Sequence, residues 1–392
     1  MAEYTISIPK LKIRGWDWLL VVGLVLSPMT GLRIWKIGPA EVLVLVWCLK
    51  YVPRKKISSS DLALFFGLFL GSMALGTMWG LFFAREELVL SGWATWIYLA
   101  FASLGMYEGL RRNGWEYNER LLYSFATLAV LWNIALYALA ITGLRSLLGA
   151  PLWYYHRYSA GGTNPHQIAI MMCGLTFIFA REIVQRRKLL WNLILMAGSS
   201  VILLATESST AIMALALGMM VELILIVNNR MFGRGRHFRL IIVEVLVAGF
   251  ILLIFYRLIY RFAYNWISSD SNGLGRIAIF SNIRNTFTKG PLFGLGPGMH
   301  SRGDGGRLIE YHNTYLEVLA ASGLCGFFAL VQFTVRLLKK TTSDNTFLPV
   351  IAALYTYGLA GFGMRRLIYW GILVFVFTIV TQKHQVRENQ QP

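Results

Sequence analysis

The sequence is short of acidic residues and of cysteine. It contains 19 acidic residues against 37 basic ones, which gives a formal net charge of +18. Its three cysteines, Cys48, Cys173 and Cys325, lie in apolar runs, with no metal-binding spacing and no obvious disulfide partner. We therefore expect three small buried hydrophobic residues and no metal site.

Nucleotide-binding motifs are also missing, since the chain has neither a Walker A sequence nor the glycine fingerprint of a dinucleotide-binding fold. Energy for any reaction must then come with the substrate, as in a diphosphate-linked donor, and we expect no cofactor. The basic surplus does not indicate a nucleic acid partner, because no basic stripe alternates with stacking aromatic residues. No cleavable signal peptide is evident, because Lys10, Lys12 and Arg14 precede a run without a small-residue exit.

Apolar residues dominate what is present. The chain is 56% hydrophobic and 14% charged, which is too apolar for a soluble protein of 392 residues. Apolar runs of roughly 17–25 residues indicate membrane helices. We predict an all-α polytopic membrane protein with a single membrane domain over residues 1–392. Its approximate spans, about twelve, are 16–32, 38–51, 61–83, 89–106, 120–143, 164–180, 189–205, 207–227, 240–260, 314–335, 346–363 and 367–381.

The basic residues orient these spans. With the N-terminus in the cytoplasm, most Lys and Arg residues fall on cytoplasmic segments, as the positive-inside rule requires, and both termini are predicted to be cytoplasmic. One external segment departs from the rule. Between the ninth and tenth spans, residues 257–313 contain Arg257, Arg261, Arg276, Arg284, Lys289, Arg302 and Arg307. An anionic ligand would explain this excess of positive charge.

We predict that residues 261–313 form a structured periplasmic loop that carries the catalytic site. Its apolar residues are too many for a disordered segment. The spacing from Leu274 to Phe287 predicts a short amphipathic helix, which Pro291 ends. Arg276 and Arg284 fall on adjacent parts of this helix and are candidates to bind one diphosphate, because the guanidinium group matches phosphate oxygens. The alternative role for Arg276 is contact with a lipid headgroup.

The strongest candidate for catalysis is His312, which lies just before the tenth predicted span. Histidine is the usual general base at neutral pH. Glu310 could orient the imidazole or accept the proton itself, and Asp304 is a further candidate for the base. Asn313 and Tyr315 are candidates for substrate contact. The alternative for His312 is a structural histidine at a helix start.

Three further groups of polar residues stand at external positions. Glu207 lies between the seventh and eighth spans, where it either contacts substrate or caps the following helix. Arg365 and Arg366 lie between the last two spans, against the positive-inside trend, and suggest a contact with phosphate or a lipid headgroup. The Gly161–Pro165 turn before a helix exposes backbone N–H groups that suit an anion. The aromatic residues before it, Tyr154, Tyr155 and Tyr158, are more typical of an interfacial belt.

Two of these stretches together resemble a known family. The run Phe293–Gly298, followed by the block His312–Gly326, is similar to the signature of the O-antigen ligase and polysaccharide polymerase superfamily. The Gly275–Arg276 pair and the Gly162–His166 turn are similar to that family's pattern as well. The resemblance implies a GT-C-like fold and a metal-independent, inverting glycosyltransferase. Its donor would be a glycan on undecaprenyl diphosphate, used at the outer face of the bacterial inner membrane.

The resemblance also implies roles for residues. His312 would activate the acceptor hydroxyl, Arg276 would bind the donor diphosphate, and His166 would lie among the substrate contacts. The Glu207–Thr210 turn departs from the family, whose members usually carry a basic residue there, so diphosphate binding would rely on Arg284, Arg365 or Arg366.

The compact external loop favours a polymerase over an O-antigen ligase that transfers glycan to lipid A–core. A lipid-linked glycan transporter remains the non-enzymatic alternative. The partners implied are a saccharide or lipid-linked acceptor, membrane lipids and a chain-length regulator.

Overall fold

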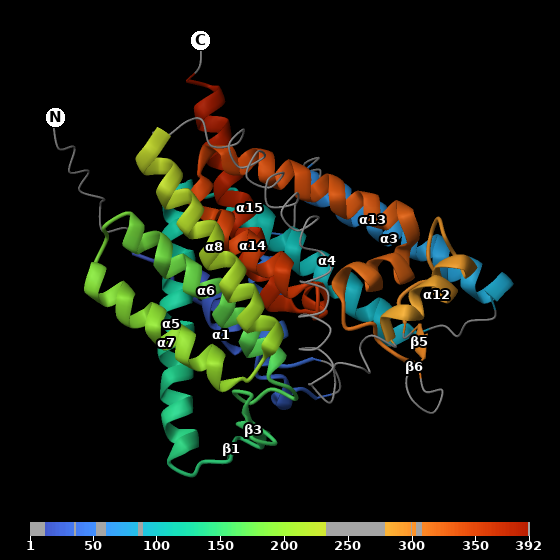
Figure 1. Ribbon diagram of the computed structural model, residues 1–392, viewed down its shortest axis with the longest axis horizontal. Coiled ribbons are helices and arrows are strands. Elements are labelled where there is room, and N and C mark those ends of the chain that lie inside the picture. The colour runs from blue at the N-terminus through green and yellow to red at the C-terminus, as the bar shows by residue number, and fades with distance from the viewer. Residues whose placement is uncertain are drawn as a thin grey trace, which may run out of the picture.

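The computed structural model describes residues 12–34, 37–51, 60–84, 89–232, 279–298, 300–302 and 308–390. These residues form a bundle of α-helices, which confirms the predicted all-α class (Figure 1). The helices are α1 (Asp17–Leu26), α2 (Pro39–Leu49), α3 (Asp61–Trp79), α4 (Leu90–Leu110), α5 (Trp115–Ile141), α6 (His166–Val184), α7 (Leu189–Ala205), α8 (Ser209–Phe232), α12 (Ile283–Lys289), α13 (Thr314–Lys340), α14 (Leu348–Tyr357) and α15 (Leu367–Glu388).

Small antiparallel hairpins and single helical turns connect the helices. The hairpins are β1 (Ser146–Leu147) with β2 (Ala150–Pro151), β3 (Trp153–Tyr154) with β4 (Arg157–Tyr158), and β5 (Ser301–Arg302) with β6 (Leu308–Ile309). The short helical turns are η1 (Thr30–Leu32), η2 (Gly80–Ala84), η4 (Thr341–Ser343), η5 (Asn345–Phe347) and η6 (Gly363–Arg365). The hairpins lie at the edge of the helical bundle, and β4 contributes Tyr158 to its core.

The prediction of about twelve spans is wrong. Among the described residues, six helices are long and apolar enough to cross a membrane: Asp61–Ala84, Trp115–Ile141, His166–Val184, Ser209–Asn228, Thr314–Ser343 and Leu367–Glu388. The predicted spans 16–32, 38–51, 189–205 and 346–363 fold as shorter helices, and 89–106 belongs to α4, which is not among the six. The predicted span 240–260 lies outside the described residues.

Proline and glycine explain why some apolar runs do not become spans. α1 ends at Leu26, just before Ser27 and Pro28, and proline disfavours helix in the residue before it. α14 has only ten residues, because Pro349 stands in its first turn and the glycine-rich stretch 358–363 follows it. Most residues of α14 are buried, so its apolar side chains pack inside the protein.

The centre of the bundle is formed by α6 and α15. Both helices are buried over most of their length, and α15 presents buried residues on every side from Leu367 to Thr381. A helix that is apolar all round belongs in a core. α13 packs along α3, and α14 packs against α8, so the first residues of α8, α13 and α15 come close together at one end (Figure 1).

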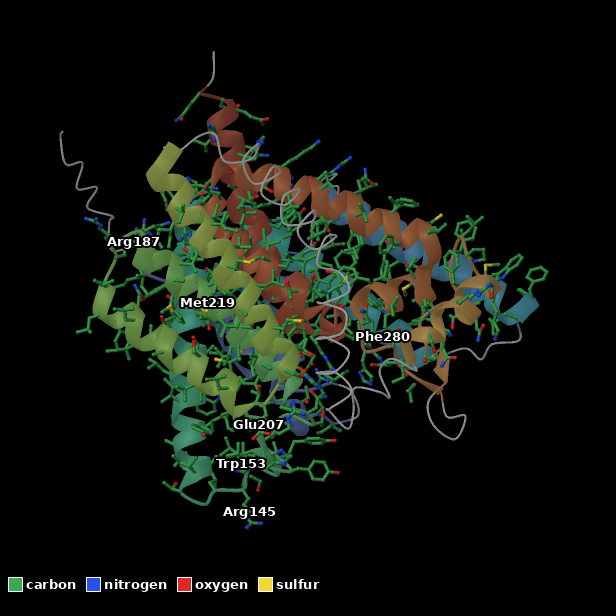
Figure 2. All side chains as sticks on the ribbon, in the orientation of Figure 1. Arg145, Trp153, Arg187, Glu207, Met219 and Phe280 are labelled. Carbon is green, nitrogen blue, oxygen red and sulfur yellow. The ribbon has the colours of Figure 1, made fainter. Side chains whose placement is uncertain are left out.

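The described ends of the chain lie on one face. Arg14 donates to the Asn113 side chain at 2.6 Å, and Gln382 donates to the Asn113 carbonyl at 2.5 Å. Arg187 and Glu207 mark opposite ends of α7, and Arg187 lies toward this face (Figure 2). Residues predicted to be cytoplasmic, such as Arg111, are therefore gathered at the end of the bundle opposite to His312.

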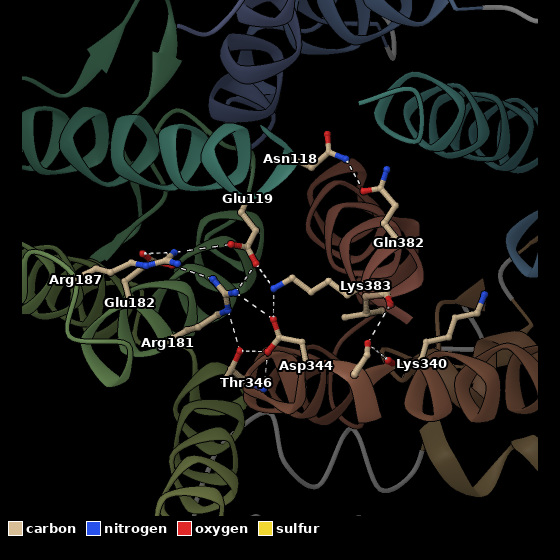
Figure 3. Close-up of polar contacts among 12 residues, drawn as sticks. Asn118, Glu119, Arg181, Glu182, Arg187, Lys340, Asp344, Thr346, Gln382 and Lys383 are labelled. Atoms are coloured by element: carbon tan, nitrogen blue, oxygen red, sulfur yellow. Dashed lines mark hydrogen bonds and ion pairs between the residues drawn. The ribbon is translucent and has the colours of Figure 1, made fainter. Parts of the chain in front are cut away.

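A buried network of ion pairs holds this face together (Figure 3). Arg181 of α6 contacts Glu119 of α5 at 2.5 Å and Asp344 at 3.1 Å. Lys383 of α15 contacts the same two carboxylates, at 2.5 and 2.6 Å. Burial alone would raise the pKa of Asp344, but Arg181 and Lys383 lower it to about 2. Each charge in the network therefore has opposite charges beside it.

Candidate functional site

The chain enters α13 through a corner formed by His312 and Asn313. The side-chain oxygen of Asn313 accepts hydrogen bonds from the N–H groups of Tyr315 and Leu316, at 2.9 and 3.1 Å, so Asn313 is the helix cap. Its amide nitrogen donates to the Leu359 carbonyl at 2.6 Å. The Tyr315 hydroxyl donates to the Tyr355 carbonyl at 2.8 Å. Both predicted substrate contacts therefore have structural partners, and their contact with substrate stays a prediction.

His312 is exposed and has a left-handed backbone, with φ of +52°. This conformation is uncommon for residues other than glycine and is often found at functional sites. Hydrogen bonds fix the backbone on both sides. The Tyr311 N–H donates to Glu317 Oε1 at 2.5 Å, and the Thr314 N–H donates to the Gly358 carbonyl at 2.8 Å. The imidazole therefore stands on a rigid support.

Tyr311 fastens the corner to α12. Its side chain is fully buried, and its hydroxyl is 2.6 Å from the hydroxyl of Thr286. Burial raises the pKa of Tyr311, which keeps it neutral. Ile279 packs against Tyr311 and Ala320. The predicted amphipathic helix, Leu274–Phe287, overlaps α12 from Ile283 onward, and α12 ends before Pro291 as expected. Residues 274–278 lie outside the described part of the chain.

The loop between α14 and α15, residues 358–366, is a meeting point that the sequence analysis did not identify. Thr314 donates to the Gly361 carbonyl at 2.9 Å and accepts from the Gly363 N–H at 3.1 Å. Thr210, at the start of α8, donates to the Ala360 carbonyl at 3.2 Å. The loop thus joins the starts of three long helices directly beside the His312 corner.

Glu310 forms an ion pair with Arg365 at the end of this loop. A carboxylate paired with a guanidinium group is a weak proton acceptor. Burial lowers the pKa of Arg365, and Arg366 lowers it further, yet arginine stays protonated at neutral pH. Of the two predicted bases, His312 is therefore favoured over Glu310 as the proton acceptor.

Arg366 is half-buried and makes no ion pair with any residue that the structure describes. Burial lowers its pKa, and the nearby charge of Arg33 acts in the same direction. Arg33 itself pairs with Glu41 of α2, and Arg365 pairs with Glu310. Among these described groups one positive charge is left without compensation, and this favours an anionic ligand.

On the opposite flank of the corner, α12 carries Arg284. This arginine is exposed and borders an apolar cleft of about 300 Å³ between α12 and α13. The cleft is lined by Ile283, Arg284, Phe287, Leu319, Leu324 and Phe327. A positive group at the edge of an apolar cleft suits a ligand with an anionic head and a hydrocarbon chain.

The glycine-rich run Phe293–Gly298 and the residues just before it pack against a break in α13. The helix is interrupted at Gly323, which has φ of +61° and ψ of −160°. Backbone hydrogen bonds from the run satisfy groups that the break exposes: Leu295 N–H to Ala320 O at 2.8 Å, Gly296 N–H to Ala321 O at 3.0 Å, Leu324 N–H to Pro291 O at 2.9 Å and Cys325 N–H to Leu292 O at 3.0 Å. The two stretches that resembled a family signature are therefore one structural unit.

Glycine is required where these backbones touch. A Cβ atom on Gly294 would lie 2.5 Å from the Ala321 carbonyl carbon, and one on Gly323 would lie 2.4 Å from the Leu292 carbonyl carbon. Cys325 follows the break and is exposed, so its predicted burial is wrong, whereas Cys48 and Cys173 are buried as expected. The break turns Cys325 away from the core.

Glu207 lies with a hairpin rather than in the corner. Its carboxylate is 2.9 Å from Nε2 of His156 in the β3–β4 turn, and both side chains are exposed. The hydroxyl of Ser208 accepts from the Ala211 N–H at 3.4 Å, so Ser208 rather than Glu207 caps α8. A substrate role for Glu207 stays a prediction.

The Gly161–Pro165 turn and His166, which follows it, use their N–H groups within the fold. The N–H groups of Gly162, Thr163 and His166 donate to Ser159 O, Thr30 Oγ1 and Asn164 Oδ1, respectively. The His166 carbonyl accepts from the Tyr357 hydroxyl at 3.1 Å. The turn therefore anchors α6 beside α14, and substrate contact by His166 stays a prediction.

The tyrosines before this turn do not all face outward. Tyr154 and Tyr155 are exposed, as an interfacial belt requires. Tyr158 is fully buried, and its hydroxyl donates to the Asn133 carbonyl at 3.3 Å. Because successive residues of a strand face opposite sides, the β3–β4 hairpin directs Tyr158 into the protein. The belt prediction is therefore wrong for Tyr158.

Several predicted residues fall outside the described part of the chain. These are Arg257, Arg261, Arg276, Asp304, Arg307 and the side chain of Arg302. Two residues that the prediction missed, Arg33 and Glu317, now stand beside the corner. Glu317 had a visible signal, because a carboxylate inside an apolar run is costly and usually has a purpose.

The helices and their apolar spans define a multi-pass membrane protein. Residues 191–331, about a third of the chain, match a family model described as O-antigen ligase. A search of curated protein sequences found no match. The matched segment begins in α7 and ends in α13, so it contains the glycine run, α12 and the His312 corner. The resemblance is thereby confirmed over this segment. Over this segment the protein is similar to membrane enzymes of the O-antigen ligase family.

Proposed function

We propose that this protein is a polysaccharide polymerase of the bacterial inner membrane, with cytoplasmic termini and a periplasmic site. It transfers a glycan from undecaprenyl diphosphate to a hydroxyl group of a second lipid-linked saccharide, with inversion and without a metal ion. One observation carries this proposal: hydrogen bonds join the His312 corner both to α12, which carries Arg284, and to the 358–366 loop, which carries Arg366.

The residues support a direct displacement. The acceptor oxygen forms a bond to the anomeric carbon while its proton passes to the imidazole of His312. The bond between that carbon and the diphosphate oxygen breaks, and the diphosphate leaves with the electron pair. A positioned base contributes roughly 10²–10⁴-fold to such a step. Cations beside the leaving group stabilise the charge that develops on it.

The donor fits the flank that carries α12. Arg284 would contact the diphosphate, and the apolar cleft beside it would hold the first isoprene units of the lipid. Arg276, which the resemblance assigns to the diphosphate, precedes Ile279 by three residues, and Ile279 packs against Tyr311 at the corner. We infer that the anionic head points toward the corner and that the lipid chain lies along α13.

The acceptor fits the flank that carries Arg366. A polymerase joins two substrates that both end in a lipid diphosphate, so it needs a second place for a phosphate group. The uncompensated charge of Arg366, beside Arg33 and Arg365, offers that place. A ligase acceptor with phosphate groups on lipid A–core would suit the same charge, and ligase activity is therefore the second candidate.

One substrate mixture separates these candidates. The purified protein is placed in lipid nanodiscs with the lipid-linked repeat unit as the sole glycan. A polymerase forms a ladder of longer lipid-linked products, whereas a ligase forms product only after lipid A–core is added. A transporter forms no larger product in either mixture, and that result would overturn the proposal.

Arginine variants then test the two flanks. Arg284→Ala and Arg366→Ala should each lower product formation about 10–100-fold, since each removes a charge-assisted contact of about 1.5–3 kcal/mol. With an acceptor that lacks diphosphate, Arg366→Ala should match the parent, whereas Arg284→Ala should stay impaired. Arg145→Ala is the control, because Arg145 is exposed in the external segment that carries the hairpins. An Arg366 variant that stays equally impaired would contradict the acceptor assignment.

A further inference from the structure

A polar pocket opens at the end of the bundle opposite to His312. It has a volume of about 460 Å³ and lies between the start of α3 and the ends of α4, α13 and α15. Its charged lining residues are Asp61, Arg111, Arg112 and Lys340. Beyond the break at Gly323, α13 continues for roughly 25 Å to Lys340, at the end away from the corner. The pocket is therefore separate from the glycosyl transfer site.

Positive charge exceeds negative charge around this pocket. Asp61 is contacted by both Lys340, at 2.6 Å, and Arg336. Two cations thus share one carboxylate. The exposed fractions of these side chains are 16% for Asp61 and 21% for Lys340, so the group is partly shielded from water. A single carboxylate compensates one of these two positive charges.

The arginine pair at the end of α4 adds to the surplus. Arg111 forms an ion pair with Glu108 at 2.7 Å. Arg112 makes no ion pair with a described residue. Its guanidinium group reaches the Tyr51 carbonyl at 3.4 Å and lies 5.5 Å from the centre of the Tyr51 ring. Around the pocket, four described cations therefore face two carboxylates.

A buried hydroxyl in the pocket wall also has no partner. Thr381 of α15 is 8% exposed, and its Oγ1 atom makes no hydrogen bond with the residues that the structure describes. An unpaired buried polar group is costly unless a ligand or water satisfies it. Together with the surplus of positive charge, this donor indicates an anion with oxygen acceptors.

We propose that this pocket binds the phosphate group of an anionic phospholipid headgroup. Three features agree with this chemistry: the surplus of arginine and lysine, the unpaired Thr381 hydroxyl and a volume within the range of small-molecule sites. A phosphate could also come from a soluble anion. The pocket lies where helices α3, α4, α13 and α15 reach one face of the bundle, and basic pockets between membrane helices at a membrane surface suit lipid headgroups.

Binding to purified protein in detergent tests the assignment. The probe is phosphatidylglycerol, with phosphatidylcholine as the zwitterionic comparison and inorganic phosphate as the soluble one, and the readouts are thermal stability and apparent affinity. Phosphatidylglycerol should raise the melting temperature of the parent, and Arg112→Gln should weaken its apparent affinity about 10-fold or more, because a charge-assisted contact is lost. Thr381→Val should weaken it as well, and it provides a second variant that alters no charge.

The control variant is Lys339→Gln, which removes a positive charge at the same end of α13 without altering the pocket lining. It should bind phosphatidylglycerol like the parent. Equal affinity in the parent, the Arg112 variant and the Thr381 variant would overturn the site. If inorganic phosphate stabilises the parent as strongly as phosphatidylglycerol, with the same dependence on Arg112, the lipid assignment is wrong and the pocket binds a soluble anion.

Discussion

The two ends of the bundle use arginine in different ways. Arg181, at the end predicted to be cytoplasmic, is 3% exposed and touches Glu119, Glu182 and Asp344 (Figure 3). Arg366, at the other end, is half-buried and has no carboxylate partner among the described residues. A buried charge without compensation is costly, so the first arrangement stabilises the fold and the second is suited to binding an anion.

This contrast shows that the overall shortage of acidic residues is not spread evenly. Glu119, Glu182 and Asp344 gather around a single arginine. Two acidic residues lie at the His312 corner. Glu310 forms an ion pair with Arg365, and Glu317 accepts a hydrogen bond from the backbone N–H of Tyr311. Net charge therefore says little about function until the acidic residues are placed in the fold.

The largest expected effect is at His312, at the end of the bundle that carries Arg366. His312→Ala should reduce product formation by about 10²–10⁴-fold, because the acceptor hydroxyl loses its base. His312→Gln should stay impaired, since it forms hydrogen bonds but does not accept the proton. His312→Asn is a useful third variant, because asparagine tolerates the left-handed backbone at this position. Product formation and donor affinity are measured together, and donor affinity should survive in all three variants.

A glutamine variant with the activity of the parent would contradict this role. His312 would then orient substrate, and Glu310 or Asp304 would become the candidate base. Because Arg365 pairs with Glu310, the variant Arg365→Met would separate these outcomes. It frees the carboxylate and should raise residual activity only if Glu310 accepts the proton.

The second prediction concerns the buried network of ion pairs around Arg181. Asp344→Asn should lower the free energy of unfolding by about 3–5 kcal/mol, because it leaves Arg181 and Lys383 buried with less opposite charge. Thermal unfolding in detergent measures the change, and the turnover of the folded fraction should stay near that of the parent. Glu388→Gln is the control, because Glu388 is 63% exposed and its surface pair contributes little.

The same carboxylate predicts a pH dependence. The pKa of Asp344 is lowered to about 2 in the folded state and is about 3.9 in an unfolded chain. Its stabilising contribution, about 2.6 kcal/mol, is therefore present above pH 4 and is lost as the pH falls toward 2. The parent should lose stability over this range, and Asp344→Asn should lose less. An identical loss in both proteins would show that other groups control acid unfolding.

Apolar patterning predicted where helices form, and it failed on which helices cross the membrane. The runs 16–32 and 346–363 are as apolar as true spans, but Pro28 and the glycines of 358–363 shorten them. Whether an apolar helix faces lipid or protein depends on its neighbours, which are distant in sequence. α15, which contacts helices from across the chain, shows this most clearly.

The candidate site was predictable where its residues are adjacent in the chain. His312, Asn313 and the glycine run carry a local signature, and the structure brings them together. The pairing of Glu310 with Arg365 spans more than fifty residues, and so does the contribution of Arg33. No periodicity records such contacts. In the sequence, the loop 358–366 was marked only by Arg365 and Arg366, which depart from the positive-inside rule. In the structure, the loop accepts hydrogen bonds from the Asn313 and Thr314 side chains at the His312 corner.

The smallest expected effect concerns Glu317, which lies near the His312 corner. Unlike the acidic residues around Arg181, Glu317 pairs with no cation in the described structure. Glu317 is 3% exposed, and its Oε1 accepts the Tyr311 N–H at 2.5 Å. Glu317→Ala leaves this N–H buried and unpaired, at a cost of about 1–3 kcal/mol, and it releases the backbone before His312. Turnover should fall about tenfold while KM for the donor stays unchanged, since the arginines are untouched. Glu317→Gln keeps a carbonyl acceptor and should restore most of the activity. If the two variants are equally impaired, the negative charge of Glu317 matters rather than its hydrogen bond, and its role as a positioning residue is refuted.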